Sequence, residues 1–212
     1  MKKQYQHTDP SSNPAAKRKR RGVLSALAVA SLLGSAAVTL SFADSTPAWG
    51  PKWTPKGELT LPDDFHHWVF LGSPLTPNAL NNGKAGFPEY HNVYIHPEAF
   101  KRYRKTGEFP EGTILLKELQ LTMAGTNADG SRVEASGRGY FPGQRNGIDI
   151  SVKDSQRFKD TNGWGFFNFG HHAPPYAKTA AAAPKNACAA CHMEKANNMV
   201  FRKFYTPILD AK

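Results

Sequence analysis

The feature that most constrains this chain is the sequence Cys188-Ala189-Ala190-Cys191-His192, close to the C-terminus. Residues three and four positions apart share one face of a helix, so both thiols and the imidazole point the same way. This spacing is the attachment pattern of a c-type haem, in which the cysteines bond covalently to the macrocycle and the histidine binds the iron. The motif therefore predicts one covalent haem on a C-terminal helix, with His192 as the proximal ligand.

Sequence context excludes two other uses of the cysteine pair. A thioredoxin-like redox pair would follow a strand early in a βαβ unit, and no such unit is seen here. A structural zinc site needs two further ligands at comparable spacing. The chain has only 2 cysteines, both of them in the motif, and it has no second C-x-x-C pair.

Residues 1–43 have the organisation of a secretory signal peptide. A basic run at 17–21 precedes an apolar run at 22–42, and Ser41-Phe42-Ala43 ends it with a small-x-small cleavage pattern. We expect cleavage after Ala43 and a periplasmic protein, which agrees with attachment of c-type haem outside the cytoplasm. An uncleaved membrane anchor is the alternative, because the apolar run is almost long enough to span a bilayer.

Much of the positive charge belongs to that leader. Seven of the 27 basic residues and one of the 17 acidic residues lie in 1–43, so the formal charge falls from +10 to +4 without it. This balance gives no reason to expect a nucleic-acid partner. A mildly basic surface suits an acidic electron-transfer protein.

The rest of the chain is long enough for one domain with a substantial core. We expect a lead-in over 44–60 and a haem domain over 61–212. Alternation and turn residues predict a long loop over 73–88, turns at Pro142-Gly143 and Asn146-Gly147, and a helix over 98–106 between Pro97 and Gly107. Strands are expected over 68–72, 89–95, 113–123, 133–140, 147–153 and 163–170.

The predicted fold class is therefore α+β: a mainly antiparallel β-sheet with a few short helices and the haem on a C-terminal helix. This pattern separates the chain from two common c-haem folds. Small electron carriers have the motif near the N-terminus and a methionine ligand far downstream. Four-helix cytochromes c-prime have long amphipathic helices, which this sequence does not show.

Lys117 is unusual within the strand predicted over 113–123. It shares the more apolar face with Leu115 and Leu119. An ammonium group there is costly unless it is paired, neutral or chemically used. A lysine that reaches a sheet edge, or a strand offset by a bulge, would also explain the pattern. A desolvated lysine is in addition a competent nucleophile.

The second axial position of the iron decides between two classes of protein. If a side chain fills it, the protein is an electron carrier, whereas an open position makes it a ligand binder or a catalyst. Sequence alone leaves this choice open. The side chains able to fill it are His66, His67, His91, His96, His171, His172, Met123 and Met199.

Several ordered segments of the chain resemble the cytochrome P-460 family. They cover most of the mature domain. The matching segments are Leu71-Gly72, Thr76-Pro77-Asn78-x-Leu80-Asn81-x-Gly83-Lys84, Val93-Tyr94-Ile95 with Pro97-Glu98, Lys105-Thr106-Gly107-Glu108-Phe109, Gly112-Thr113, Lys117-Glu118-Leu119, Ser151-Val152-Lys153-Asp154-Ser155, Arg157-Phe158, Cys188–His192 and Met199-Val200-Phe201.

This resemblance implies a periplasmic, usually dimeric enzyme whose five-coordinate haem has an open distal face. In the family a lysine is cross-linked to a meso carbon of the porphyrin, and the matching residue here is Lys117. The implied activity is oxidation of hydroxylamine to nitrous oxide or other nitrogen oxides, with electrons leaving to an external cytochrome. Phe87 and His91 match the family's distal wall.

One position departs from the family pattern. Active members carry a distal carboxylate about five residues before the first haem cysteine, and Ala183 stands there in this chain. Such a carboxylate would accept a proton from the bound substrate. Without it, proton removal must use water or another group, such as His91, His171 or His172.

Three functions therefore remain in competition. The first is a hydroxylamine-oxidising enzyme with a lysine–haem cross-link, and the second is a protein like cytochrome c-prime-beta that binds nitric oxide or carbon monoxide without turnover. The third is an electron-transfer cytochrome. Lys117 favours the first over the second, and Ala183 weakens the first without strengthening the third.

Overall fold

The computed structural model describes residues 46–211. The predicted signal peptide at 1–43 and the start of the lead-in lie outside these residues. No helix within 46–211 is long and apolar enough to cross a membrane.

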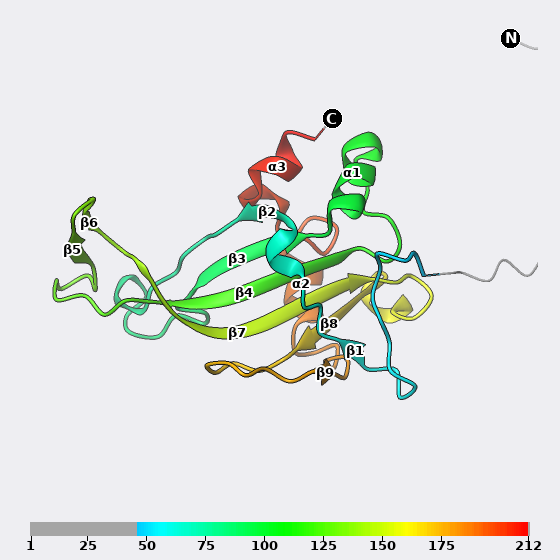
Figure 1. Cartoon of the computed structure of the whole chain (residues 1–212), viewed down its shortest axis with the longest axis horizontal. Helices are drawn as coiled ribbons and strands as arrows, with labels where there is room; N and C mark the ends of the chain where they lie inside the picture. The colour runs from blue at the N-terminus through cyan, green and yellow to red at the C-terminus, as the bar shows by residue number, and fades with distance from the viewer. Residues whose placement is uncertain (1–45, 212) are drawn as a thin grey trace, which may run out of the picture. The chain divides into compact units, whose positions relative to one another are not determined.

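An antiparallel sheet of five strands forms the centre of the domain (Figure 1). Its order is β2-β3-β4-β7-β8, and each neighbouring pair is antiparallel. The strands are β2 (Val69–Gly72), β3 (Tyr90–Ile95), β4 (Ile114–Thr122), β7 (Pro142–Lys153) and β8 (Trp164–Asn168). The predicted mainly antiparallel α+β class is confirmed.

Short elements surround this sheet. Two small antiparallel pairs are β1 (Leu59–Thr60) with β9 (Thr179–Ala180) and β5 (Arg132–Glu134) with β6 (Gly137–Gly139). The helices are α1 (Pro97–Thr106), α2 (Ala189–Lys195) and α3 (Thr206–Leu209). Single 3-10 turns are η1 (Phe65–His67), η2 (Asn78–Leu80), η3 (Lys159–Thr161) and η4 (Arg202–Phe204).

Helix α1 begins and ends where its sequence predicts. Pro97 occupies a first-turn position, where a missing N–H leaves no hydrogen bond unmade. Gly107 follows the helix with a left-handed φ of 73°, and its amide donates to the Tyr103 carbonyl at 2.7 Å. A residue with a β-carbon would be strained in that conformation.

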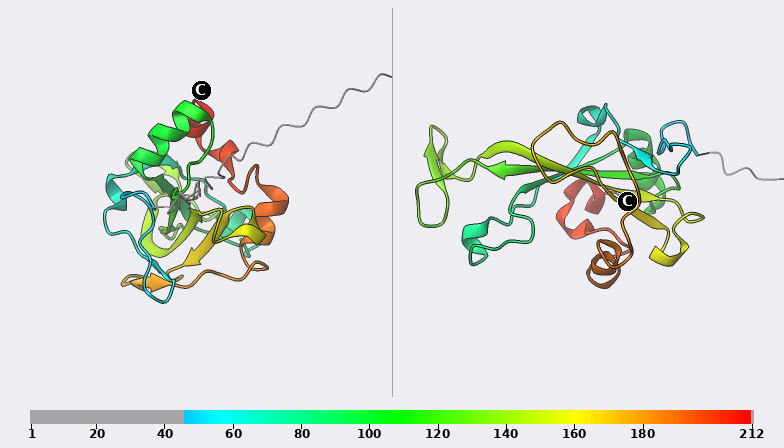
Figure 2. Two further views of the ribbon diagram at one scale, coloured as in Figure 1. Left: turned by 90° about the vertical axis from the view of Figure 1, so that its right-hand side faces the viewer. Right: turned by 90° about the horizontal axis from the view of Figure 1, so that it is seen from below.

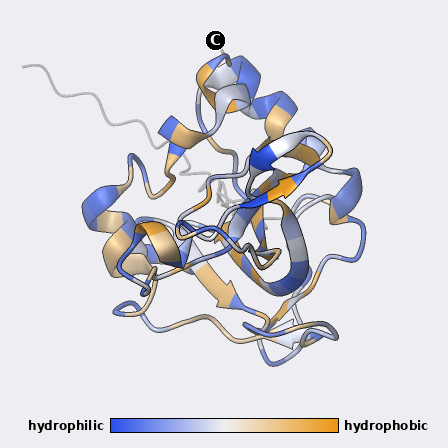
Figure 3. Ribbon diagram, turned by 90° about the vertical axis from the view of Figure 1, so that its left-hand side faces the viewer, coloured by the Kyte–Doolittle hydropathy of each residue, from blue (hydrophilic) through white to orange (hydrophobic). Residues whose placement is uncertain are grey.

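The two faces of the sheet carry separate apolar clusters. On one face Val93, Leu115 and Phe166 pack with residues of the C-terminal segment, including Ala189, Met199 and Val200; we call this the motif face. On the other, the opposite face, residues such as Leu116 and Ile150 pack against Leu59, Phe65 and Trp68. Figure 2 shows α2 and the N-terminal segment on different sides of the sheet, and Figure 3 shows apolar segments within its strands.

Two sequence predictions in the second half of the sheet are wrong. Residues 133–140 form the hairpin of β5 and β6 instead of one strand. Strand β7 runs straight through both predicted turns, because pairing with β4 extends from Val152 to Pro142. Pro142 is the first residue of β7, where a missing N–H is tolerated, and Asn146 is the extra residue of a bulge between Gly147 and Arg145.

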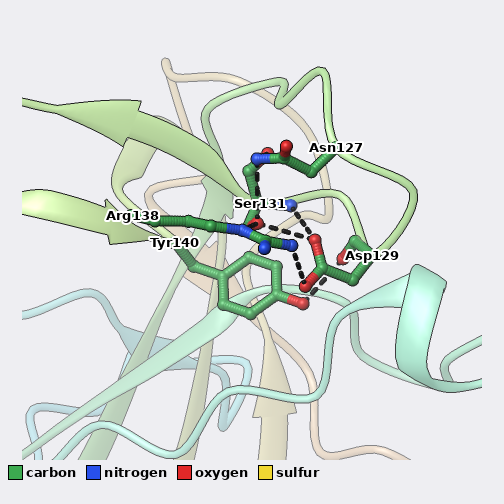
Figure 4. A network of polar contacts seen from close by, with 5 residues as sticks. All are labelled: Asn127, Asp129, Ser131, Arg138 and Tyr140. Carbon is green, nitrogen blue, oxygen red and sulfur yellow. Dashed lines mark hydrogen bonds and ion pairs between the residues drawn. The ribbon is translucent and has the colours of Figure 1, made fainter.

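The β5–β6 hairpin projects beyond the central sheet (Figure 1). A polar network holds its base together: Asp129 accepts from Ser131 and Arg138, and Tyr140 donates to the Asp129 carbonyl (Figure 4). The hydrogen bonds from Ser131, followed by that from Arg138, lower the pKa of Asp129 to about 2. The network fixes the loop that precedes the hairpin.

Candidate haem site

The cysteine–histidine motif lies where its sequence predicts. Cys188 is the residue before α2, and Cys191 and His192 lie within the helix. Both cysteines are free; Cys188 is half-buried and Cys191 is exposed. No group of three or more metal-ligating His, Cys, Asp or Glu side chains occurs within residues 46–211. The thiols are thus available for covalent attachment.

The backbone prepares His192 to bind a metal through one nitrogen. Its Nδ1 lies 2.7 Å from the Met199 carbonyl, so Nδ1 carries the proton and Nε2 is left for the iron. Met199 reaches this place through a left-handed backbone, with a φ of 65°. Burial, aided by Lys117, lowers the pKa of His192 and so favours the neutral ring that ligates metals.

Aromatic rings fix the plane of this imidazole. Phe166 of β8 has its ring centroid 4.5 Å from that of His192, and Phe201 lies 4.9 Å away on the C-terminal segment. The thiols, the oriented imidazole and this apolar cradle fit a c-type haem, whose macrocycle requires an apolar, water-poor surface.

Lys117 lies on the motif face and is ion-paired. Its Nζ is 2.9 Å from Asp149 Oδ2, and the register places Asp149 directly opposite it on β7. The irregular pairing between β4 and β7 begins only beyond Leu119, so Lys117 is not displaced from the apolar face. The Lys117 charge contributes to lowering the pKa of both His91 and His192, in each case after burial.

The Asp149 carboxylate contacts three polar side chains. Besides Lys117 it accepts from Asn168 Nδ2 at 2.7 Å, and His171 Nε2 lies 3.1 Å away. Burial raises the pKa of Asp149, but the Lys117 charge and the hydrogen bonds from Lys117 and Asn168 outweigh it, and the net pKa is lowered. The carboxylate therefore stays ionised and holds Lys117 in place.

Phe87 covers the lysine from the long 73–88 loop. The Lys117 Nζ lies 4.0 Å from the Phe87 ring centroid, close enough for a cation–π interaction. The same ring stands edge-on to His91 at 5.6 Å and to His171 at 5.8 Å. The structure thus brings together Lys117, Phe87 and His91.

Most of the side chains proposed for the second axial position of the iron lie away from Lys117 and Phe87. His66 and His67 belong to η1 on the opposite face, and the His96 side chain caps α1. Met123 follows β4 and is exposed, while the Met199 sulfur accepts a contact from Asn162 and its carbonyl holds His192. Of the eight candidates, His91 and His171 are the two that contact Phe87.

A family model for cytochrome P460 matches residues 62–202. The chain belongs to the cytochrome P460 family. It is accordingly a c-type haem cytochrome. No curated protein matches the chain.

The position that departs from the cytochrome P460 pattern lies in the segment that precedes α2. Ala183 is half-buried against the motif-face cluster, and its amide donates to the Phe166 carbonyl at 2.7 Å. Phe166 is the ring that packs on His192. A methyl group at this place has no capacity to take a proton.

Sequence reasoning missed three polar residues of this cytochrome P460 site. Asp149 pairs with Lys117, and Asn168 donates a hydrogen bond to Asp149. Glu89 is a buried carboxylate just before β3. Apolar and polar residues alternate over 147–153, and Asp149 is one of several polar residues there, so the sequence only weakly indicates a role for it. Glu89 shares the predicted strand face with His91, which was the usable signal.

Proposed function

We propose that the protein is an exported mono-haem enzyme that oxidises hydroxylamine to nitrous oxide or other nitrogen oxides. Electrons pass to an external acceptor. The observation that carries this proposal is Lys117, which lies on the motif face between His192 and His91 and is held by Asp149. Cytochromes that only carry electrons have no use for such a lysine.

In this proposal Cys188, Cys191 and His192 hold the haem and Lys117 forms a third covalent bond to it. When bound, the haem supplies an iron that holds the substrate nitrogen and receives its electrons. The Met199 carbonyl orients His192, and Asp149 fixes the Lys117 side chain. Phe87 shields the lysine from water with an apolar ring.

The remaining parts of the proposal concern location and partners. Residues 1–43 would direct export to the periplasm, which c-haem attachment requires. Exposed Lys185 and Lys203 flank the haem-bearing segment, beside the exposed Cys191, and would suit an acceptor cytochrome with an acidic surface. The family resemblance supports a homodimer.

A second function is favoured by Ala183, which cannot act as a base. In this alternative the site binds nitric oxide or carbon monoxide without turnover, as in cytochrome c-prime-beta. Two measurements on the purified holoprotein separate the proposals. Hydroxylamine-dependent reduction of an artificial acceptor is expected for the enzyme. Tight binding of nitric oxide with no hydroxylamine turnover would replace it by the ligand-binding protein.

A further inference from the structure

Two buried polar atoms on the motif face have no hydrogen-bond partner within residues 46–211. One is Oε2 of Glu89, whose residue is only 5% exposed, and the other is Nε2 of His91. Buried polar atoms in folded proteins are nearly always paired. Two unpaired atoms only two residues apart in the chain, one just before β3 and one within it, therefore indicate a place where a polar ligand or its water binds.

The bulge between β4 and β7 orients the Glu89 carboxylate. Leu119 pairs with Gly147 and Gln120 with Arg145, which leaves Asn146 as the additional residue of β7. The Asn146 amide donates to Glu89 Oε1 at 2.6 Å. Bulges commonly re-aim a side chain beside a functional site. This one holds one carboxylate oxygen of Glu89 and leaves the other free.

The register places the pair beyond Lys117 as seen from His192. Residues paired across neighbouring strands form rows that cross the sheet. Phe166, which packs on His192, shares a row with Ser151 and Leu115. The next row on the same face contains Lys117, and the row after that contains His91. Same-face positions on a strand are about 7 Å apart. Phe87 joins the last two rows, since its ring contacts both Lys117 and His91. The pair thus lies on the side of the lysine away from the proximal histidine.

His91 is poised as a neutral base. Burial is the largest cause that lowers the pKa of His91; the charge of Lys117 adds to it while that lysine is not bonded to the haem, and the Phe87 carbonyl, Glu89 and Asp149 oppose it. The influence of the Phe87 carbonyl on the pKa of His91 requires a ring nitrogen on its side, and because Nε2 is without a partner that nitrogen is Nδ1. A neutral imidazole that donates from Nδ1 carries its lone pair on Nε2. The free atom is therefore a proton acceptor.

The other histidines of this region are engaged. His171 is exposed and its Nε2 lies 3.1 and 3.2 Å from the Asp149 oxygens. His172 is exposed and its Nδ1 faces the Ala173 carbonyl. Of these three histidines, His91 alone combines burial with a free nitrogen.

We propose that His91 accepts the substrate's protons in this chain and that Glu89 positions it and stabilises its charged form, in place of a carboxylate at position 183. The proposal rests on hydroxylamine oxidation as the function. Two hydroxylamine molecules give nitrous oxide, water, four protons and four electrons; the electrons go to the acceptor cytochrome. The protons leave N–H and O–H bonds one at a time through His91 Nε2, which returns to the neutral form by releasing each to solvent.

The first test needs no turnover. Carbon monoxide is bound to the reduced holoprotein, and its infrared stretching frequency reports polar groups near the open iron position. We expect a shift in His91→Gln and in Glu89→Gln. Glu118→Gln, which changes an equally buried carboxylate on the opposite face, is expected to show none. An unchanged frequency in both motif-face variants, or an equal shift in the control, overturns the placement. If His91→Gln yields no holoprotein, His91→Asn is measured instead.

The second test uses hydroxylamine turnover. Loss of a general base costs about 10²–10⁴-fold in rate, so His91→Gln should lower kcat by this order and abolish the acidic limb of kcat/KM. A nearby carboxylate favours the imidazolium, so Glu89→Gln should move that limb to lower pH with a smaller fall in kcat; a merely structural Glu89 would leave it in place.

The two proposals fail differently. A wild-type protein without turnover refutes hydroxylamine oxidation, while the infrared measurement still decides the placement of the pair. A wild-type protein with turnover whose rate and pH profile survive in His91→Gln refutes the proton-accepting role alone.

Discussion

The two faces of the central sheet treat buried charge in different ways, and the contrast begins at two adjacent residues. Lys117 projects from the motif face and Glu118 from the opposite face of the same strand. Glu118 is 4% exposed and its Oε1 lies 3.1 Å from Arg145 Nε and 3.5 Å from His66 Nε2. Geometry makes this an ion pair rather than a hydrogen bond, since that oxygen has no hydrogen-bond partner among the described residues.

On the opposite face, the buried carboxylate of Glu118 pairs with two side chains that are partly exposed to solvent. Arg145 and His66 are about half exposed, so the ion pairs of Glu118 reach solvent. The motif face instead keeps both Lys117 and Asp149 mostly covered. Buried atoms without a hydrogen-bond partner occur on both faces of the described domain: Glu89 Oε2 and His91 Nε2 on the motif face, and Trp68 Nε1, Glu118 Oε1 and Tyr176 Oη on the opposite face. Such groups lower stability. The two faces therefore differ in whether both members of an ion pair are covered, and not in whether polar atoms are left unpaired.

Replacement of Lys117 tests this contrast with the largest expected effect. If the lysine is bonded to the haem, the reduced wild-type protein should show a Soret band strongly red-shifted from that of an ordinary c-haem. Lys117→Ala should abolish the red shift entirely while the haem stays attached through Cys188 and Cys191. The optical spectrum of the reduced protein, with denaturing gel detection of covalent haem, measures both outcomes.

A matched control is available on the same sheet. Lys153 is similarly covered, pairs with Glu111 at 3.6 Å and lies four residues beyond Asp149 on β7. Lys153→Ala should keep the wild-type spectrum. An unshifted wild-type band, or a red-shifted band that persists in Lys117→Ala, would show that Lys117 is not cross-linked.

Truncation of Leu116 tests the other side of the contrast. Leu116 is fully buried in the opposite-face cluster, and Leu→Ala at such sites costs about 2–5 kcal/mol of unfolding free energy. We expect that loss in denaturant unfolding, with the reduced spectrum unchanged. Leu80→Ala, at a residue 65% exposed, should stay within about 0.5 kcal/mol. A changed spectrum in Leu116→Ala would mean that the two faces are not independent.

The sequence predicted those parts of the fold that depend on local pattern. Helix α1 has its proline and glycine at the ends, and β3 and β4 alternate clearly, so their bounds differ from the predictions by a residue or two. The long strand β7 was divided by false turn signals. Pairing with β4 overrides the local preference of Asn146-Gly147, because a bulge accommodates the additional residue.

The same reason limits what the sequence could say about the site. The haem motif and Lys117 are visible locally, as a fixed spacing and as a charge on an apolar face. Asp149 becomes the partner of Lys117 only through the β4–β7 register, and Asn146 reaches Glu89 only through the bulge. Both are long-range properties, which no local pattern of residues encodes.

The smallest expected effect concerns the pH dependence of stability. Lys117 and the hydrogen bonds to Asp149 lower the folded-state pKa of Asp149 despite its burial. A carboxyl with a lowered folded pKa adds stability that is fully present above its unfolded pKa, about 4. That contribution is lost as the pH falls through the lower folded value. Asp149→Asn should therefore show a flatter loss of unfolding free energy below about pH 4 than the wild type.

Denaturant unfolding at a series of acidic pH values measures this difference. Asp160→Asn removes an exposed carboxylate and should follow the wild-type curve. If Asp149→Asn also follows that curve, the Lys117–Asp149 pair does not persist in solution. Lys117 would then lack the partner that holds it beneath Phe87, and the motif face would lose the charged arrangement that distinguishes it from the opposite face.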